Sequence, residues 1–132
     1  MKTILSVFII LHGLVHIWYI LIINRIVDFT PDMGWTGKSW LLSQCFSENS
    51  LRYMAIILYL LVTLLFMISG LAILINIEWQ KTIITVAALL SSLTIIIFFD
   101  GKFELLVQKG FLGLIINLII ISIILYSRIK LN

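Results

Sequence analysis

Four long stretches without a charged residue dominate this sequence, at residues 3–23, 53–75, 82–99 and 110–127. An α-helix rises about 1.5 Å per residue, so even an 18-residue run reaches roughly 27 Å, close to the bilayer hydrocarbon core of about 30 Å. Transmembrane strands would be about half as long in sequence and would alternate polar with apolar residues. These runs do not alternate. We therefore predict four membrane-spanning helices over these ranges.

Composition supports a lipid environment. The chain has 132 residues, of which 62% are hydrophobic and 11% charged, whereas soluble domains average roughly 45–50% apolar and about 25% charged. A soluble domain of this length cannot bury so much apolar surface. The net charge of +3 does not indicate nucleic acid, because the basic residues lie between the apolar runs and form no stripe for phosphates. We predict an integral membrane protein whose partner is the lipid bilayer, with no nucleic-acid partner.

The connections between the runs predict the architecture. Residues 76–81 and 100–109 are short and polar, which favours antiparallel neighbours in an up-down bundle. Residues 24–52 are longer and contain Pro31, Trp35 and Trp40, and the apolar spacing over 39–46 predicts a short helix lying in the membrane interface. Asn49 or Ser50 is the predicted N-cap of the second span. The fold prediction is all-α: one transmembrane domain over residues 1–132, a four-helix up-down bundle with a short interfacial helix in its first loop.

Charge gives little information on sidedness. The face with both termini carries Lys2, Lys81, Arg128 and Lys130, and the opposite face carries Arg25, Lys38, Arg52, Lys102 and Lys109. The positive-inside rule counts these basic residues and barely separates the two faces. We interpret both termini as cytoplasmic. The first span is followed by no small-residue cleavage site, so we expect it to be retained. Cys45 is the only cysteine, which excludes an intrachain disulfide.

Two histidines inside the first span are the strongest candidate site. His12 and His16 are four residues apart, so both rings lie on one helix face, and Gly13 would let another helix approach closely. Counting from the ends of the spans places Ser91 and Asn117 at about the same depth, together with Thr63, Ser92 and Thr94. Ionisable residues inside a membrane are costly. His12, His16, Ser91 and Asn117 are therefore candidate ligand-binding residues in one polar layer.

Several roles for this layer remain open on the sequence. A His-x-x-x-His pair suits zinc or copper, so His12 and His16 are candidate metal ligands. A histidine could also bind haem iron, although two ligands on one helix face cannot sandwich one haem and would need a partner chain. The histidines could relay protons or polarise a small ligand. Alternatively, they hydrogen-bond to Asn117, Ser or Thr and hold the helices together.

Asp100 is the fifth candidate site residue. It lies at the predicted end of the third helix, where the helix dipole favours cations rather than acids, so we expect a specific cationic partner such as Lys38, Arg52 or Lys102. Gly101 is the predicted C-cap.

The order of the motifs resembles small DoxX-like membrane proteins of bacteria and archaea. The matching segments are His12-Gly13-Leu14-Val15-His16, Ser69-Gly70, Leu90-Ser91, Phe99-Asp100-Gly101-Lys102-Phe103 and Asn117. The resemblance implies a four-helix bundle in a prokaryotic cell membrane. Some DoxX-like proteins associate with membrane redox enzymes, which suggests a quinone or redox-complex role by analogy only.

Two functions of different class follow from the sequence. The first is a non-enzymatic membrane protein, either an accessory subunit of a membrane complex or a homo-oligomer packed through small-residue faces. The second is a binding or redox protein that uses His12 and His16 for a small ligand, metal, haem or quinone. We favour the first.

Overall fold

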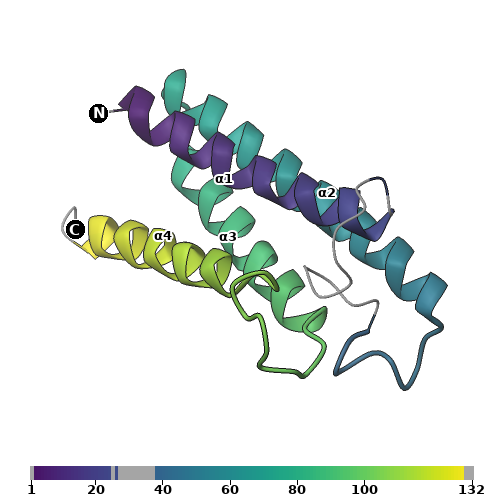
Figure 1. The fold of residues 1–132 in the computed structure, drawn as a ribbon. Coiled ribbons are helices and arrows are strands. Elements are labelled where there is room, and N and C mark those ends of the chain that lie inside the picture. The colour runs from purple at the N-terminus through teal and green to yellow at the C-terminus, as the bar shows by residue number, and fades with distance from the viewer. Residues whose placement is uncertain (1, 25, 27–37, 130–132) are drawn as a thin grey trace.

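The structure, a computed structural model, describes residues 2–24, 26 and 38–129, without the side chains of residues 127–129. Within this part the chain forms four helices and no strand: α1 (Lys2–Ile23), α2 (Glu48–Leu74), α3 (Gln80–Ile97) and α4 (Phe111–Ile129). Each helix covers one of the four predicted runs (Figure 1). The predicted all-α helical bundle is confirmed.

Length and composition make α1, α2 and α3 long and apolar enough to cross a membrane, and α4 is apolar over Phe111–Tyr126. The 27 residues of α2 give a length of about 40 Å, which exceeds a bilayer hydrocarbon core of about 30 Å. Glu48 and Arg52 form a 2.8 Å ion pair in its first turns. The N-cap of α2 is Ser47, whose side chain accepts a hydrogen bond from the Ser50 amide. The prediction of Asn49 or Ser50 as N-cap was wrong, because the helix begins at Glu48, several residues before the uncharged run.

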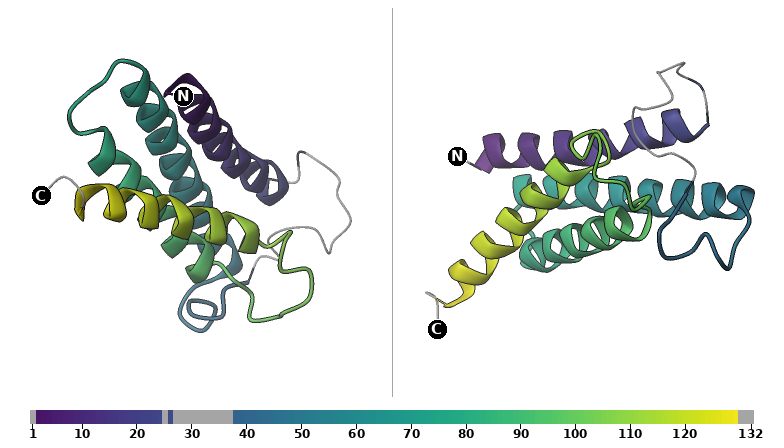
Figure 2. Two further views of the ribbon diagram at one scale, coloured as in Figure 1. Left: turned by 90° about the vertical axis from the view of Figure 1, so that its left-hand side faces the viewer. Right: turned by 60° about the horizontal axis from the view of Figure 1, so that its bottom comes forward.

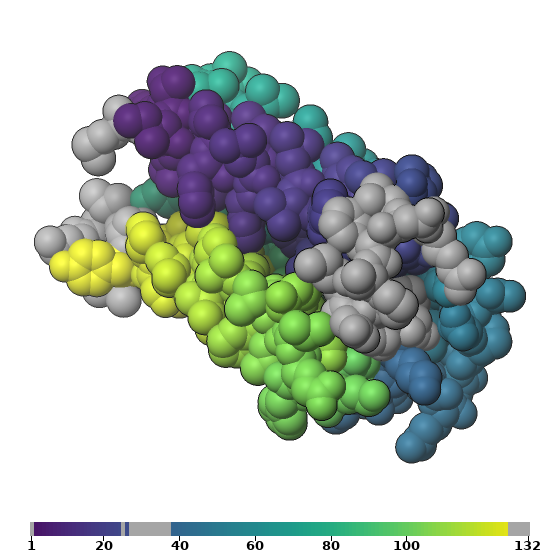
Figure 3. Space-filling view, viewed as in Figure 1, coloured from purple at the N-terminus to yellow at the C-terminus, as the bar shows by residue number. Residues whose placement is uncertain are grey.

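Consecutive helices make the main contacts of the bundle, with α1 on α2, α2 on α3, and α3 on α4. The start of α1 and the end of α4 lie at the same end of the molecule (Figure 1). Figure 2 shows α4 diverging from the other three helices toward its C-terminal end. On the face shown in Figure 3, α1 and α4 are both at the surface. The chain therefore runs up and down, as predicted.

Two glycines allow α1 and α2 to pack closely. A Cβ atom added at Gly13 would lie 2.6 Å from Cβ of Phe66, and one added at Gly70 would clash with Cγ1 of Ile10. Ser6 Oγ donates a 2.7 Å hydrogen bond to the Gly70 carbonyl. The close approach predicted at Gly13 is confirmed, and the neighbour is α2 of the same chain.

The apolar core consists of two clusters. One includes Ile9, Phe66 and Ala87, and the other includes Tyr19, Tyr59 and Phe98. Along α1, His12 and His16 lie between the residues of the first cluster and those of the second.

The first loop is tied to the end of α3. The Trp40 amide donates to the Phe99 carbonyl at 2.8 Å, and Trp40 Nε1 donates to the Ile96 carbonyl at 2.7 Å. Ser39 Oγ donates to the Ile97 carbonyl. The last carbonyls of a helix have no partner within the helix, and this segment supplies donors to them. In place of a regular interfacial helix, residues 40–45 form a run of turns. Pro31 and Trp35 lie outside the described residues.

Candidate functional site

Four of the five predicted site residues form one closed hydrogen-bond circuit, which we call the polar circuit. His12 Nε2 lies 2.9 Å from Asn117 Oδ1, and Asn117 Nδ2 donates to Ser91 Oγ at 2.8 Å. Ser91 Oγ lies 2.8 Å from His16 Nε2, and His16 Nδ1 lies 3.1 Å from the His12 carbonyl oxygen. The circuit joins α1 to α3 and α4. Because the main helix contacts are between consecutive helices, it links α1 to helices on which it packs little.

The directions of these hydrogen bonds follow from which atoms can donate. A carbonyl oxygen only accepts, so the proton on His16 lies on Nδ1 and the proton on His12 lies on Nε2. His16 Nε2 then has a lone pair that accepts from the Ser91 hydroxyl, while Ser91 Oγ accepts from Asn117. Every donor therefore meets an acceptor with both imidazoles neutral.

The circuit is buried. His12 is 6% exposed and His16 2%, whereas Ser91 and Asn117 are 0% exposed. No buried side-chain nitrogen or oxygen lacks a hydrogen-bond partner among the residues that the structure describes. Full pairing of buried polar groups is expected in a low-dielectric environment, because an unpaired polar group costs several kcal/mol in lipid.

Aromatic rings of α2 complete the layer, and they were not among the residues predicted for it. The Phe66 ring centre lies 4.8 Å from that of His12 and 5.7 Å from that of His16. Tyr59 lies 6.1 Å from His16 and stacks on Tyr19 at 5.0 Å. The seven-residue spacing of Tyr59 and Phe66, which places them on one helix face, was the available signal.

The remaining polar residues predicted at this depth do not join the circuit. The hydroxyls of Thr63, Ser92 and Thr94 each donate to the carbonyl four residues earlier in their own helix. This pattern is common for Ser and Thr in helices. Thr63 of α2 nevertheless lies at the predicted depth, with its carbonyl oxygen 3.3 Å from where a Cβ on Gly13 would be, but it does not join the circuit.

The geometry limits what the circuit can do chemically. Both ring nitrogens of His16 and Nε2 of His12 are already hydrogen-bonded within it, so a metal at any of them would displace a partner. The described residues contain no group of three or more His, Cys, Asp or Glu placed to hold a metal ion. Ser91 and His16 have the spacing of a nucleophile and its base, but a fully buried Ser91 leaves no room for a substrate.

Asp100 lies apart from the circuit. Its Oδ2 is 2.9 Å from Lys109 Nζ, in an ion pair whose side chains are 3% and 9% exposed respectively. Its Oδ1 accepts from the Lys102 backbone amide at 3.0 Å. Lys109 was not among the predicted partners of Asp100. Helical periodicity predicts which residues share a helix face, but it does not predict which residues meet across a loop. Because α3 ends at Ile97 with Phe98 as its C-cap, Gly101 does not cap the helix, and it adopts a φ of +81° in the following loop.

Comparisons with known proteins add no relative: no family model, curated protein or solved structure matches the chain. Its function must be inferred from its own geometry.

Proposed function

We propose that this chain is a four-span membrane protein without catalytic activity, which serves as an accessory component of a membrane complex. The observation that carries the proposal is the closed polar circuit. Its donors and acceptors satisfy one another across three helices, as expected for groups that hold helices together in lipid. On this view, the intramembrane histidines hold the fold, and the chain acts through its surfaces.

The membrane location is supported by the three helices of spanning length and by the apolar α4. Because the start of α1 and the end of α4 lie at one end (Figure 1), an even number of crossings follows. We place both termini in the cytoplasm of a prokaryotic cell, in keeping with the DoxX-like order of motifs.

The accessory role is supported by where the chain can meet other molecules. Large apolar side chains on the outward faces of the helices are exposed, among them Leu11 at 57%, Ile57 at 64% and Leu93 at 53%. Such faces contact lipid or another membrane protein. The small residues Gly13 and Gly70 pack inside the chain, so a homo-oligomer would have to use larger side chains.

A ligand-binding role for the histidines is the second candidate, and one observation favours it. Nδ1 of His12 lies outside the polar circuit and has a lone pair in the tautomer assigned above. It could accept a hydrogen bond from the hydroxyl of a small ligand such as a quinol, or bind a metal or haem iron at a single position.

Two measurements test these proposals. Protein extracted from its own membranes in mild detergent should appear in native mass spectrometry bound to a defined partner in fixed ratio; a single chain in every detergent would contradict the accessory role. The visible spectrum and metal content of the purified protein should match those of the His12→Ala variant. A Soret band, or one metal per chain, that disappears in His12→Ala would instead establish the second candidate.

A further inference from the structure

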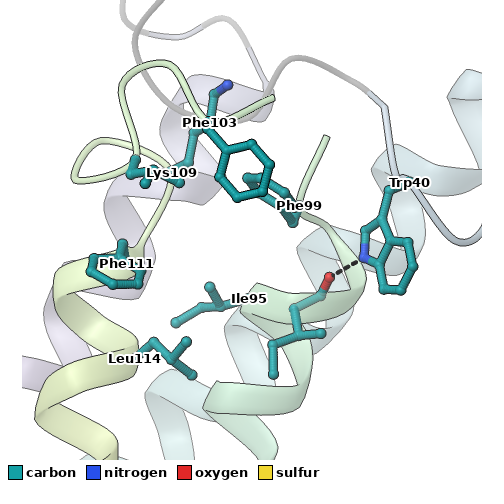
Figure 4. A pocket seen from close by; sticks show the side chains of 9 residues that line it. Trp40, Ile95, Phe99, Phe103, Lys109, Phe111 and Leu114 are labelled. Carbon is teal, nitrogen blue, oxygen red and sulfur yellow. Dashed lines mark hydrogen bonds between the residues drawn. The ribbon is translucent and has the colours of Figure 1, made fainter. Parts of the chain in front are cut away.

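A separate apolar pocket lies between the end of α3 and the start of α4. Its volume is about 230 Å³. Figure 4 shows the side chains that surround it, which come from both helices, the loop between them and the first loop. The walls include Trp40, Ile95, Phe99, Phe103, Phe111 and Leu114. None of these residues belongs to the polar circuit.

The polar groups nearest the pocket are bonded within the protein. Lys109 contributes to the lining, yet its Nζ bonds to Asp100 at 2.9 Å and to the Lys102 carbonyl at 3.1 Å. Trp40 Nε1 donates to the Ile96 carbonyl at 2.7 Å (Figure 4). What remains for a ligand is hydrocarbon and aromatic surface, which offers it no hydrogen bond.

Polar contacts fix the position of the pocket walls at both ends. On the inner side, Asn117 lies one turn beyond Leu114 and is bonded to Ser91 of α3. On the outer side, the buried ion pair of Asp100 and Lys109 closes the loop between the two helices. These two contacts set the spacing of α3, α4 and the loop between them at either end of the pocket.

The position of the pocket determines what can enter it. It lies beside the last turn of α3, which ends at Ile97, and therefore where a membrane-crossing helix meets the outer part of the hydrocarbon core. An empty space there would deprive its lining atoms of dispersion contacts. An apolar cavity of about 150 Å³ already admits benzene, so this pocket has room for a larger apolar group. The molecules present at that depth in a bilayer are lipid chains.

We propose that this pocket binds one acyl chain of a bilayer lipid, whose head group lies outside over the loop between α3 and α4. The charges of that loop predict that binding does not depend on the charge of the head group. Residues 100–109 carry two acids, Asp100 and Glu104, and two bases, Lys102 and Lys109, so their charges cancel. Recognition is by the shape of the hydrocarbon. The inference rests on the membrane location proposed above and is independent of any role for the histidines.

Photolabelling in a defined bilayer tests the proposal. Purified full-length protein is reconstituted in phosphatidylcholine vesicles that contain a little phosphatidylcholine with a diazirine on its acyl chain, irradiated, and mapped by mass spectrometry. We expect the label to concentrate on residues 95–114. Leu114→Trp fills the pocket and should remove this labelling. Leu112→Trp is the matched control, because Leu112 is 54% exposed on the same helix and does not line the pocket.

Competition on the wild-type protein avoids reliance on a variant that fails to fold. Excess single-chain lysophosphatidylcholine should displace the label from the pocket, whereas glycerophosphocholine, which has the head group alone, should not. Replacing the vesicle lipid by phosphatidylglycerol should leave the pattern unchanged.

Several outcomes would overturn the inference. Labelling as dense on the outward face of α1 as in the pocket would show general lipid contact only. Displacement by glycerophosphocholine, or equal labelling in Leu114→Trp and Leu112→Trp, would exclude an acyl-chain site. Cross-links between two chains at the pocket would assign it to a second copy. A protein labelled nowhere would contradict the membrane location itself, and the accessory role with it.

Discussion

At the scale of single residues, Asn117 is the side chain on which the polar circuit depends most. It accepts from His12 and donates to Ser91. Asn117→Ala removes both bonds and leaves the His12 N–H and one lone pair of Ser91 buried without their partner. The free energy of unfolding should fall by about 1–3 kcal/mol, measured by denaturant titration in mixed micelles.

Ser122→Ala on the same helix is the control, since Ser122 bonds only to its own helix and its loss should change stability by less than about 0.5 kcal/mol. Equal effects of the two substitutions would contradict the importance of the circuit.

The bond between His12 and Asn117 can be isolated by a double-mutant cycle. His12→Ala, Asn117→Ala and the double variant should give a coupling energy of about 0.6–1.7 kcal/mol, which lies between the average and the maximum measured for hydrogen bonds between membrane helices. The same titration supplies all four values. If the two single effects simply add, the 2.9 Å contact contributes nothing to stability.

Sequence reasoning identified four residues of the circuit for a physical reason. The four-residue spacing of His12 and His16 sets their common face, and the span limits set the depth of Ser91 and Asn117. It could not identify Phe66 as their neighbour, because which aromatic of α2 faces α1 depends on how the two helices rotate against each other. The pairing of Asp100 with Lys109 likewise depends on the path of a loop.

At the scale of helices, the spacing between α1 and α2 is set by Gly13. A methyl group there would meet Cβ of Phe66 at 2.6 Å, an atom that cannot move without its backbone. Gly13→Ala should therefore destabilise the protein by about 1–3 kcal/mol, as overpacking does. Gly113→Ala on α4 has room, since its nearest neighbour would be 3.4 Å away, and should be neutral or stabilising by up to about 1 kcal/mol. Thermal unfolding of both variants measures the difference, and a stable Gly13→Ala protein would show that the helices can separate at no cost.

The loop between α3 and α4 depends on one buried ion pair. Asp100→Asn leaves the ammonium of Lys109 buried without its counter-ion, a change that typically costs about 3–5 kcal/mol. Adding Lys109→Met should restore part of the loss, because the double variant contains no unpaired charge. Unfolding of the two single variants and the double variant tests this, and a double variant less stable than both single variants would contradict it.

The four helices were predictable from the long uncharged runs, and most of their boundaries to within a few residues. The start of α2 and the structure of the first loop were less predictable. The Glu48–Arg52 ion pair allows α2 to begin in polar sequence. Ser39 and Trp40 donate hydrogen bonds to the last carbonyls of α3, and their segment does not form a helix of its own.

At the scale of the whole molecule, an up-down bundle places the first and second loops on opposite sides of the membrane. Cys45, the only cysteine, is exposed in the first loop, and Glu78 is exposed in the second. With both termini cytoplasmic, a membrane-impermeant maleimide should label Cys45 in intact cells. The variant Cys45→Ser with Glu78→Cys should be labelled only after the membrane is opened. The reverse pattern would invert the orientation, and labelling of both positions in intact cells would exclude the four-span topology.

The polar circuit also has a consequence for how the chain is made. Synthesis delivers α1 first, together with α2, and the glycine contacts between these two helices can form at once. The partners of His12 and His16 are Asn117 on α4 and Ser91 on α3, which emerge from the ribosome last. Until α3 and α4 are made, His16 lacks Ser91 and His12 lacks Asn117, and in lipid such unpaired polar groups are costly. A chain that stops before α4 therefore leaves the His12 imidazole without its Asn117 partner.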